Sequence, residues 1–448
     1  KMTRLFGTDG VRGIANQKLT PKLCYDIGRA AAFVLTKNKK GKVLVGRDTR
    51  LSGDLVESAL IAGFMSLGLD VDVAGVIPTP GVAYLTRTGD YLCGVSISAS
   101  HNPFEYNGIK FFSSQGLKLD DSLEDDIEEK VLSTTKIYKD VTGDQVGRVN
   151  RSHEFTEKYI SYLKGLTDER FDGFEVAVDA GNGAQSFIAE EVLKSYGARV
   201  KIINNEPNGK NINDKCGSTN PKLIEELVKK EKSHIGMSFD GDADRIIAVD
   251  EEGKIVDGDH ILAIAATYLK ENNKLNNNAA VGTIMSNMGL KKYLESIDVD
   301  FIETKVGDRY ILERMLKDDY IIGAEQSGHV IFLDYNTTGD GLATGIHLLE
   351  IMKKTGKKLS ELNGLMKDYP QVLKNARVRD ELKNRYEEFP DIIKAIKEVE
   401  EAYHGSGRVV IRPSGTEALV RVMIEGEDTY KLSQDADKLV KIIEEKLN

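Results

Sequence analysis

The sequence of 448 residues lacks the features that mark several specialised classes of protein. Its three cysteines (Cys24, Cys93 and Cys216) are far apart and form no CxxC pair, so a disulfide framework and a thiolate zinc site are disfavoured. No apolar run approaches the roughly 18 residues needed to cross a bilayer. The first residues, Lys1–Arg4, lack the apolar core of a secretory signal. We therefore expect a cytoplasmic protein that has no membrane partner.

Proline is also scarce, with nine residues, and no low-complexity tract occurs, so long disordered segments are not expected. The 71 acidic residues outnumber the 61 basic ones and give a formal charge of -10, which repels nucleic acid over most of the surface. Any anionic ligand must therefore be held by a local basic site. The length predicts three or four compact units, each with its own core.

One pattern occurs three times along the chain: a β-branched run, a corner rich in Gly, Asp or Asn, an amphipathic stretch and a second β-branched run. The first runs are Lys42–Gly46, Phe174–Asp179 and Ala279–Thr283. This alternation predicts three similar α/β domains with mixed, largely parallel sheets, arranged around a central cleft. The corners follow the carboxyl ends of strands, where open α/β sheets bind their ligands.

The last stretch has a different pattern and predicts a smaller α+β domain. A charged helix over 390–403 precedes the strands Arg408–Arg412 and Ala418–Ile424, and a closing helix spans 429–446. The expected domains are residues 1–152, 153–254, 255–368 and 369–448.

The first motif that could carry chemistry is Ser100-His101-Asn102-Pro103, which follows a run of small residues. The turn at His-Asn-Pro presents the Ser100 hydroxyl and the His101 imidazole at a strand end. An ordinary Asn-Pro turn is the simpler interpretation of such a pair on its own. The hydrolase pattern GxSxG is absent, so a serine esterase is disfavoured.

The second motif has carboxylates at alternating positions, Asp240, Asp242 and Asp244, followed by Arg245. Three such carboxylates can converge on one hard divalent cation, and without a cation their mutual repulsion is costly. An EF-hand is excluded because Arg245 stands where that loop requires glycine and because the flanks are typical of strands. A solvated acidic turn is disfavoured by the apolar runs on both sides.

Two further motifs suit a phosphorylated sugar. Glu325 and Ser327 can bind vicinal hydroxyls, and His329 can move a proton near neutral pH, although a polar loop with a structural histidine remains open. A later turn of small residues offers backbone N–H groups, two hydroxyls and flanking guanidinium groups, which together make a phosphate cradle. Its residues are Arg412, Ser414, Gly415 and Thr416, with Arg421 on the next strand.

Taken together, these four motifs make the chain resemble the α-D-phosphohexomutase family across essentially its whole length. The motifs correspond to that family's phosphoserine, metal, sugar and phosphate loops, in the family's order and one per domain. The opening Phe6–Gly13 and the forms Asp-Gly-Asp-Ala-Asp-Arg and Glu-Gln-Ser-Gly-His resemble a bacterial branch. That branch interconverts glucosamine 6-phosphate and glucosamine 1-phosphate and thereby supplies UDP-N-acetylglucosamine for cell-wall precursors.

The resemblance implies a phosphoryl group on Ser100 and a hexosamine 1,6-bisphosphate intermediate, which also acts as activator. It implies one Mg²⁺ per chain, bound by Asp240, Asp242, Asp244 and Ser100. It makes His329 the first candidate for general base, and it implies that four further side chains lie near the transferred group as charge stabilisers. Those side chains are Arg12, His101, Lys110 and Arg245. It also suggests a homodimer and a mobile fourth domain.

Three alternatives stay open on the sequence. A phosphoglucomutase or phosphomannomutase would use the same machinery, and only relative kcat/KM values distinguish the substrates. A catalytically idle sugar-phosphate sensor predicts the loss of one motif, and none is lost. A metal-dependent phosphatase needs neither a serine carrier nor a separate cradle.

Overall fold

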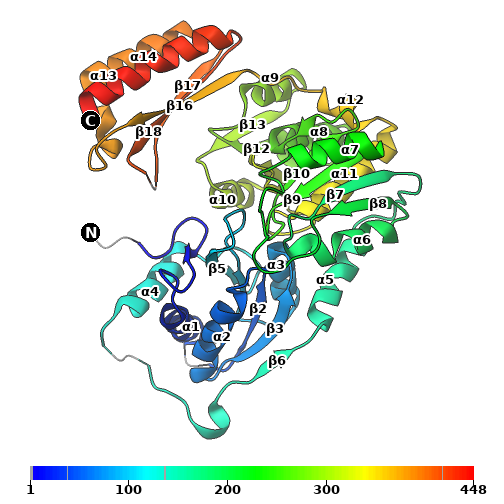
Figure 1. Cartoon of the computed structure of the whole chain (residues 1–448), viewed down its shortest axis with the longest axis vertical. Coiled ribbons are helices and arrows are strands. Elements are labelled where there is room, and N and C mark those ends of the chain that lie inside the picture. The colour runs from blue at the N-terminus through cyan, green and yellow to red at the C-terminus, as the bar shows by residue number, and fades with distance from the viewer. Residues whose placement is uncertain (1–3, 38, 136–137, 416) are drawn as a thin grey trace.

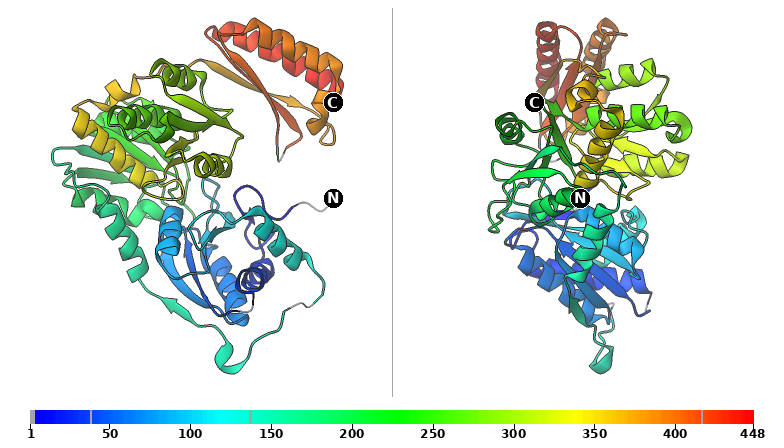
Figure 2. Two further views of the ribbon diagram at one scale, coloured as in Figure 1. Left: turned by 180° about the vertical axis from the view of Figure 1, so that it is seen from behind. Right: turned by 90° about the vertical axis from the view of Figure 1, so that its right-hand side faces the viewer.

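The structure is a computed structural model that describes residues 4–37, 39–135, 138–415 and 417–448. The described residues form four sheets, each with its own helices (Figures 1 and 2). We call each sheet with its helices a unit, numbered I to IV in chain order. Within the described ranges, no helix combines the length and the apolar character that crossing a membrane would need.

Unit I contains a mixed sheet in the order β1-β5-β4-β2-β3-β6, in which β5 is antiparallel to both neighbours. Its strands are β1 (Val11–Ile14), β2 (Lys42–Arg47), β3 (Asp70–Val76), β4 (Cys93–Ile97), β5 (Tyr106–Ser113) and β6 (Val149–Arg151). Its helices are α1 (Pro21–Thr36), α2 (Gly53–Ser66), α3 (Thr79–Thr88), α4 (Asp121–Leu132) and the 3-10 helix η1 (Gly143–Gln145). Helix α1 begins where Thr20 accepts a hydrogen bond from the backbone N–H of Leu23. Helices α1 and α2 pack closely, and glycine at position 63 allows this, since a Cβ there would lie 2.3 Å from the Tyr25 carbonyl oxygen.

Unit II contains a sheet in the order β11-β10-β9-β7-β8, in which β7, β8 and β9 are parallel and β10 is antiparallel. Its strands are β7 (Glu175–Asp179), β8 (Arg199–Ile203), β9 (Ile235–Phe239), β10 (Ile246–Asp250) and β11 (Ile255–Val256). Its helices are α5 (Glu154–Lys164), η2 (Ala184–Phe187), α6 (Ala189–Ser195) and α7 (Lys222–Glu231).

Unit III contains a sheet in the order β13-β12-β14-β15, with only β15 antiparallel to its neighbour. Its strands are β12 (Ala279–Thr283), β13 (Asp300–Thr304), β14 (Ile322–Ala324) and β15 (Val330–Phe332). Its helices are α8 (Gly258–Glu271), η3 (Asn276–Asn278), α9 (Met288–Ser296), α10 (Asp308–Asp318), α11 (Gly341–Thr355) and α12 (Leu359–Asn363). The crossovers β2–α2–β3, β7–α6–β8 and β12–α9–β13 each join parallel strands, which confirms the three predicted α/β units.

Unit IV is smaller and its sheet is antiparallel, in the order β16-β18-β17, as expected for an α+β domain. It contains β16 (Gln371–Arg377), β17 (Arg408–Pro413), β18 (Leu419–Glu425), η4 (Lys383–Glu388), α13 (Pro390–Ala402) and α14 (Thr429–Leu447). The sequence predicted β17 and β18 but not β16. This edge strand buries only Ala376, so it lacks the apolar alternation that marks a strand.

One apolar cluster extends through units I, II and III, since Leu44, Phe239 and Ile264 all belong to it. The prediction that each unit has its own core is therefore wrong for these units, although unit I also has a cluster of its own. Unit IV has a separate core and lies at one end of the molecule (Figure 1). The β17–β18 hairpin extends towards unit I in Figure 1 and in the left view of Figure 2.

Candidate active site

The loop after β4 carries Ser100, which is 2% exposed and has a φ of 51°. Its backbone N–H donates to Ser98 Oγ over 2.9 Å, and the N–H of Asn102 donates to the Ala99 carbonyl over 3.0 Å. The left-handed conformation is unfavourable for serine, so the surrounding structure must hold it in place.

The three aspartates lie between the antiparallel strands β9 and β10. Each is buried and offers a carboxylate oxygen within 4.8 Å of the others. The Ser100 hydroxyl donates to Asp240 Oδ2 over 2.6 Å, although 140 residues separate the two positions. The structure thus brings the serine of unit I into direct contact with the carboxylates of unit II.

Burial and mutual repulsion shift the pKa values of these carboxylates. Burial, with the charges of Asp244 and Asp242, raises the pKa of Asp240 well above its ordinary value. Burial and the charge of Asp244 also raise the pKa of Asp242 to about 6. Burial alone would raise the pKa of Asp244, but hydrogen bonding from His329 and the charge of Arg245 lower it. A bound cation would relieve this repulsion.

The donor atoms fit a hard divalent cation. Asp242 Oδ1 and Asp244 Oδ1 are buried and have no hydrogen-bond partner among the described residues. Buried carboxylate oxygens without a partner are costly, and oxygen ligands of this kind are those that Mg²⁺ prefers. The arrangement therefore suits a magnesium ion held by the aspartate oxygens.

Of the predicted charge-stabilising side chains, His101, Lys110 and Arg245 lie near the aspartate triplet, and Arg12 lies near His101. Arg245 Nη1 lies 3.1 Å from His101 Nδ1, and burial with the charges of Arg245 and Arg12 lowers the pKa of His101. Lys110 Nζ lies 3.4 Å from Asp308 Oδ2. Burial alone would lower the pKa of Lys110, but the negative charges of nearby aspartates raise it; these are Asp308, Asp244, Asp9 and Asp242. The site therefore combines buried anions with cations that could attract a phosphoryl group.

The hairpin between β14 and β15 carries Glu325, Ser327 and His329. Its contact with unit II requires glycine at position 328, where φ is 98° and a Cβ would lie 2.0 Å from the Ile246 carbonyl oxygen. The Gly328 carbonyl accepts a hydrogen bond from the Ile246 N–H over 3.0 Å. Ser327 is exposed and Glu325 is half-buried, so both can meet a ligand.

His329 is 2% exposed and lies against the metal-binding loop. Its Nδ1 is 3.5 Å from Asp244 Oδ2, and its Nε2 accepts a hydrogen bond from the Gly339 N–H over 3.3 Å. Burial alone would lower the pKa of His329, but the hydrogen bond with Asp244 and nearby negative charges raise it.

The predicted phosphate cradle lies on the β17–β18 hairpin of unit IV. Arg412 stands opposite Arg421 in the register of the two strands, and burial with the charge of Arg421 lowers the pKa of Arg412. Ser414 is buried and its Oγ accepts a hydrogen bond from the Glu417 N–H over 3.1 Å, whereas Gly415 is exposed. Thr416 lies outside the described residues.

The sequence did not single out several residues that hold these loops. Thr79, at the start of α3, donates its hydroxyl to Asp242 Oδ2 over 2.7 Å. Asn213 donates its amide to the Ser100 carbonyl over 2.8 Å. The buried pair Asp48 and Arg50 also contacts the phosphoserine loop. The position of Asp48 and Arg50 directly after a parallel strand was the available signal.

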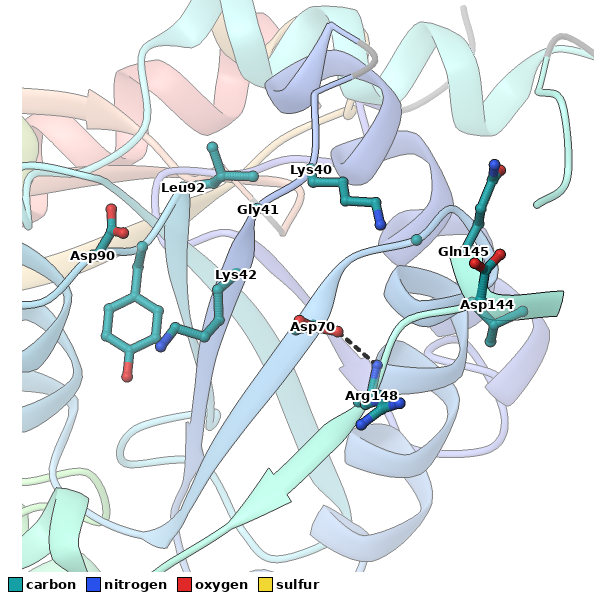
Figure 3. Close-up of a pocket in the computed structure, with 12 residues that line it drawn as sticks. Lys40, Gly41, Lys42, Asp70, Asp90, Leu92, Asp144, Gln145 and Arg148 are labelled. Atoms are coloured by element: carbon teal, nitrogen blue, oxygen red, sulfur yellow. Dashed lines mark hydrogen bonds between the residues drawn. The ribbon is translucent and has the colours of Figure 1, made fainter. Parts of the chain in front are cut away.

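A separate surface pocket of about 620 Å³ lies at the start of β2, at the end of the strand that is away from Asp48 and Arg50 (Figure 3). Lys40, Lys42 and Asp70 line it, and the Arg148 backbone N–H donates to Asp70 Oδ1 over 2.8 Å. None of the four motifs contributes to its lining.

Comparisons with known proteins cover nearly the whole chain. Models of the phosphoglucomutase/phosphomannomutase alpha/beta/alpha domains I, II and III match residues 3–137, 157–253 and 257–369, and the C-terminal domain model matches 373–442. A phosphoglucosamine mutase of Alkaliphilus metalliredigens is 54% identical over 447 residues, with 100% of both chains covered.

Two solved structures show the same fold at low sequence identity. A phosphoglucomutase/phosphomannomutase family protein from Burkholderia thailandensis has a TM-score of 0.81 at 22% identity and covers 100% of this chain and 99% of its own. Aspergillus fumigatus N-acetylphosphoglucosamine mutase, in complex with GlcNAc-6P and magnesium, has a TM-score of 0.71 at 17% identity. It covers 100% of this chain and 96% of its own.

The matched models span all four units in the order found here, and the full-length identity to curated relatives is far above the level at which only the fold is shared. The chain therefore belongs to the phosphoglucomutase/phosphomannomutase family, the α-D-phosphohexomutases, and is a mutase of that family.

Proposed function

We propose that this mutase interconverts glucosamine 6-phosphate and glucosamine 1-phosphate, with Ser100 carrying the phosphoryl group. The observation that carries the proposal is the 2.6 Å contact between the Ser100 hydroxyl and Asp240, beside two further buried carboxylates. Support for the substrate comes from the full-length relatives named phosphoglucosamine mutase. The product would supply UDP-N-acetylglucosamine synthesis in the cytoplasm.

The reaction would proceed by two phosphoryl transfers. A hydroxyl of the substrate attacks the phosphorus of phosphorylated Ser100, the bond from phosphorus to Ser100 Oγ breaks, and a hexosamine 1,6-bisphosphate forms. The sugar turns round in the site, and its other phosphoryl group returns to Ser100 Oγ. The products are the isomeric monophosphate and the phosphorylated enzyme.

Asp240, Asp242 and Asp244, with the Ser100 oxygen, would hold one Mg²⁺ per chain. Bound there, Mg²⁺ neutralises charge on the phosphoryl oxygens and on the leaving oxygen. Magnesium in the Aspergillus fumigatus structure agrees with this choice of metal. The protein itself supplies cations round the transferred group from Arg12, Lys110 and Arg245, and His101 would add a neutral imidazole that can donate a hydrogen bond.

His329 is our first candidate for the base that accepts the proton of the attacking hydroxyl. Glu325 and Ser327 would bind sugar hydroxyls, which fall in similar places in both orientations of the substrate. The phosphate that is not reacting would be held by the cradle of unit IV, in which the hairpin extends towards unit I (left view of Figure 2). The cradle residues are Arg412, Ser414, Gly415, Thr416 and Arg421.

We also propose that the first three domains end at residues 152, 254 and 368 and that the enzyme is a homodimer.

The test is an assay of the full chain with Mg²⁺, a catalytic amount of glucosamine 1,6-bisphosphate and glucosamine 6-phosphate. We expect formation of glucosamine 1-phosphate, one added phosphate by intact mass, and a higher kcat/KM than for glucose or mannose phosphates. Ser100→Ala should abolish both turnover and phosphorylation. Free phosphate formed faster than the isomer, or no phosphate on Ser100, would contradict the proposal.

A further inference from the structure

Asp48 and Arg50 form a buried ion pair directly after β2. Their side chains are 1% and 0% exposed, and Arg50 Nε donates to Asp48 Oδ2 over 2.9 Å. The backbone N–H of Arg50 donates to Asp48 Oδ1 over 3.1 Å. Burying two charges is unfavourable unless the remaining donors and acceptors of both side chains also form hydrogen bonds. The further hydrogen bonds of Asp48 and Arg50 therefore indicate what this buried pair does.

Among the described residues, the other hydrogen-bond partners of the Arg50 guanidinium are carbonyl oxygens between residues 100 and 106, in the phosphoserine loop and at the start of β5. Nη2 donates to the Ser100 carbonyl over 2.9 Å. Nη1 lies 2.9 Å from the Asn102 carbonyl, 2.5 Å from the Pro103 carbonyl and 3.1 Å from the Tyr106 carbonyl. One fixed, planar side chain therefore defines the path of the loop from residue 100 to residue 106.

Asp48 holds the same loop from the other side. The Ser98 hydroxyl donates to Asp48 Oδ2 over 2.5 Å and accepts a hydrogen bond from the Ser100 N–H over 2.9 Å. The Ser100 backbone is thus bound at its N–H through Asp48 and at its carbonyl through Arg50. Asn213 of unit II adds a second donor to that carbonyl over 2.8 Å.

These contacts explain how Ser100 keeps its unfavourable left-handed conformation. With the backbone held on both sides at a φ of 51°, the hydroxyl points at Asp240. If the backbone relaxed to an extended conformation, the direction of the Cα–Cβ bond would change and the hydroxyl would leave the carboxylates.

We propose that Asp48 and Arg50 are positioning residues for phosphoryl transfer, which act by fixing the backbone of Ser100 so that its Oγ faces the aspartate triplet. The inference rests on the proposed function, in which Ser100 carries the phosphoryl group. Among the described residues, the side-chain hydrogen bonds and the ion pair of Asp48 and Arg50 do not involve the sugar-binding or cradle residues, so we expect the pair to affect the chemical step and not substrate binding.

The test compares Arg50→Lys with Arg47→Lys in the full-length enzyme with Mg²⁺. Lysine keeps the charge beside Asp48 but cannot reach four carbonyls from a fixed plane. Arg47 is the matched control, because it occupies the same corner and pairs instead with Asp54 and Glu57. Asn213 is half-buried, and Asn213→Ala removes its hydrogen bond to the Ser100 carbonyl. This variant replaces Arg50→Lys in the test if Arg50→Lys does not fold.

For Arg50→Lys we expect kcat to fall on the order of 100-fold with KM within threefold, as a displacement of about 1 Å in a reacting group would produce. The amide hydrogens of residues 98–106 should exchange faster than in the parent enzyme. Asn213→Ala should lower kcat by a smaller factor, and Arg47→Lys should change neither measurement.

The inference is overturned if folded Arg50→Lys retains kcat within twofold, if only KM changes, or if kcat falls without faster exchange in the loop. If Arg50→Lys does not fold, an unchanged kcat and exchange rate in Asn213→Ala overturn it. A parent enzyme that converts no hexose phosphate would contradict the proposed function instead. The exchange comparison would then still show whether Arg50 holds the loop.

Discussion

Arg408 and Glu425 connect unit IV to unit III. Arg408 Nε donates to Glu425 Oε2 over 3.0 Å within the β17–β18 pair, and the Glu425 side chain is completely buried. The same carboxylate accepts a hydrogen bond from the Met288 N–H over 2.9 Å, and Arg408 Nη1 donates to the Ile284 carbonyl over 2.5 Å. The orientation of the cradle relative to the other loops thus depends on this pair.

Replacing Arg408 with methionine should loosen the attachment of unit IV. The change leaves Glu425 buried without its cation, which costs about 3 kcal/mol for a pair of this kind. We expect a lower urea midpoint by circular dichroism and faster proteolysis near residues 368–371. Arg377→Met is the control because Arg377 is exposed on β16. Equal midpoints for the two variants would contradict the structural role of Arg408.

Removal of one carboxylate should weaken metal binding. Asp242→Asn removes one negative charge and turns one carboxylate oxygen into an amide NH₂ group, which cannot bind a cation, so the affinity for Mn²⁺ should fall at least tenfold by calorimetry, about 1.4 kcal/mol. Treatment of the parent enzyme with EDTA should abolish turnover, and Mg²⁺ should restore it. Exposed Asp214 in unit II provides the control substitution Asp214→Asn, for which affinity should not change. Unaltered affinity in Asp242→Asn would place the metal elsewhere.

His347 should make the protein less stable in mild acid. Its ring packs between Phe332 and Tyr335, and burial, with the charges of Lys354 and Lys274, lowers its pKa to about 4 from an ordinary value of 6.5. The unfolded chain takes up a proton near pH 6.5 and the folded protein does so only near pH 4. Stability is therefore lost as the pH falls through this window, by about 3 kcal/mol in all.

Urea midpoints between pH 7 and pH 4 check the role of this histidine. His347→Phe should flatten the dependence on pH in that window, because phenylalanine does not titrate. The exposed His404 supplies the matched substitution His404→Phe, which should leave the slope unchanged. An identical slope in the parent protein and in His347→Phe would show that other groups cause the acid sensitivity.

Gly63→Ala should destabilise unit I. The added Cβ would lie 2.3 Å from the Tyr25 carbonyl oxygen, so α1 and α2 must move apart, at a cost of about 1–3 kcal/mol. Gly165→Ala is the comparison, because the nearest atom to its Cβ is 3.6 Å away. Thermal unfolding of both variants measures the difference. A Gly63→Ala variant as stable as Gly165→Ala would mean that the two helices are less tightly packed than described here.

Much of the fold was predictable because its signals are local. The runs Ala279–Thr283 and Ile235–Phe239 coincide with β12 and β9, since a buried strand needs a short run of apolar residues whatever its neighbours are. Strand β16 was missed because an edge strand with one buried side chain leaves no such pattern. The aspartate triplet was recognised because its spacing alone suggests a shared cation.

Other features depend on contacts between distant segments. Arg50 followed an ordinary strand corner in the sequence, and a charged residue there is usually exposed, yet its side chain is completely buried under the phosphoserine loop. Thr79 gave no signal either, because its partner Asp242 lies 163 residues further along the chain.

The sequence by itself determined the strands and helices of the three crossovers and the chemical groups of each loop, because these follow from short-range backbone preferences and from the alternation of buried positions. Only the tertiary structure decided that Ser100 meets Asp240, that Arg50 is enclosed by carbonyl oxygens, and that unit IV is attached through Arg408. Such contacts arise from the packing of whole sheets against one another, and the free energy of a buried charge depends on every partner that this packing supplies.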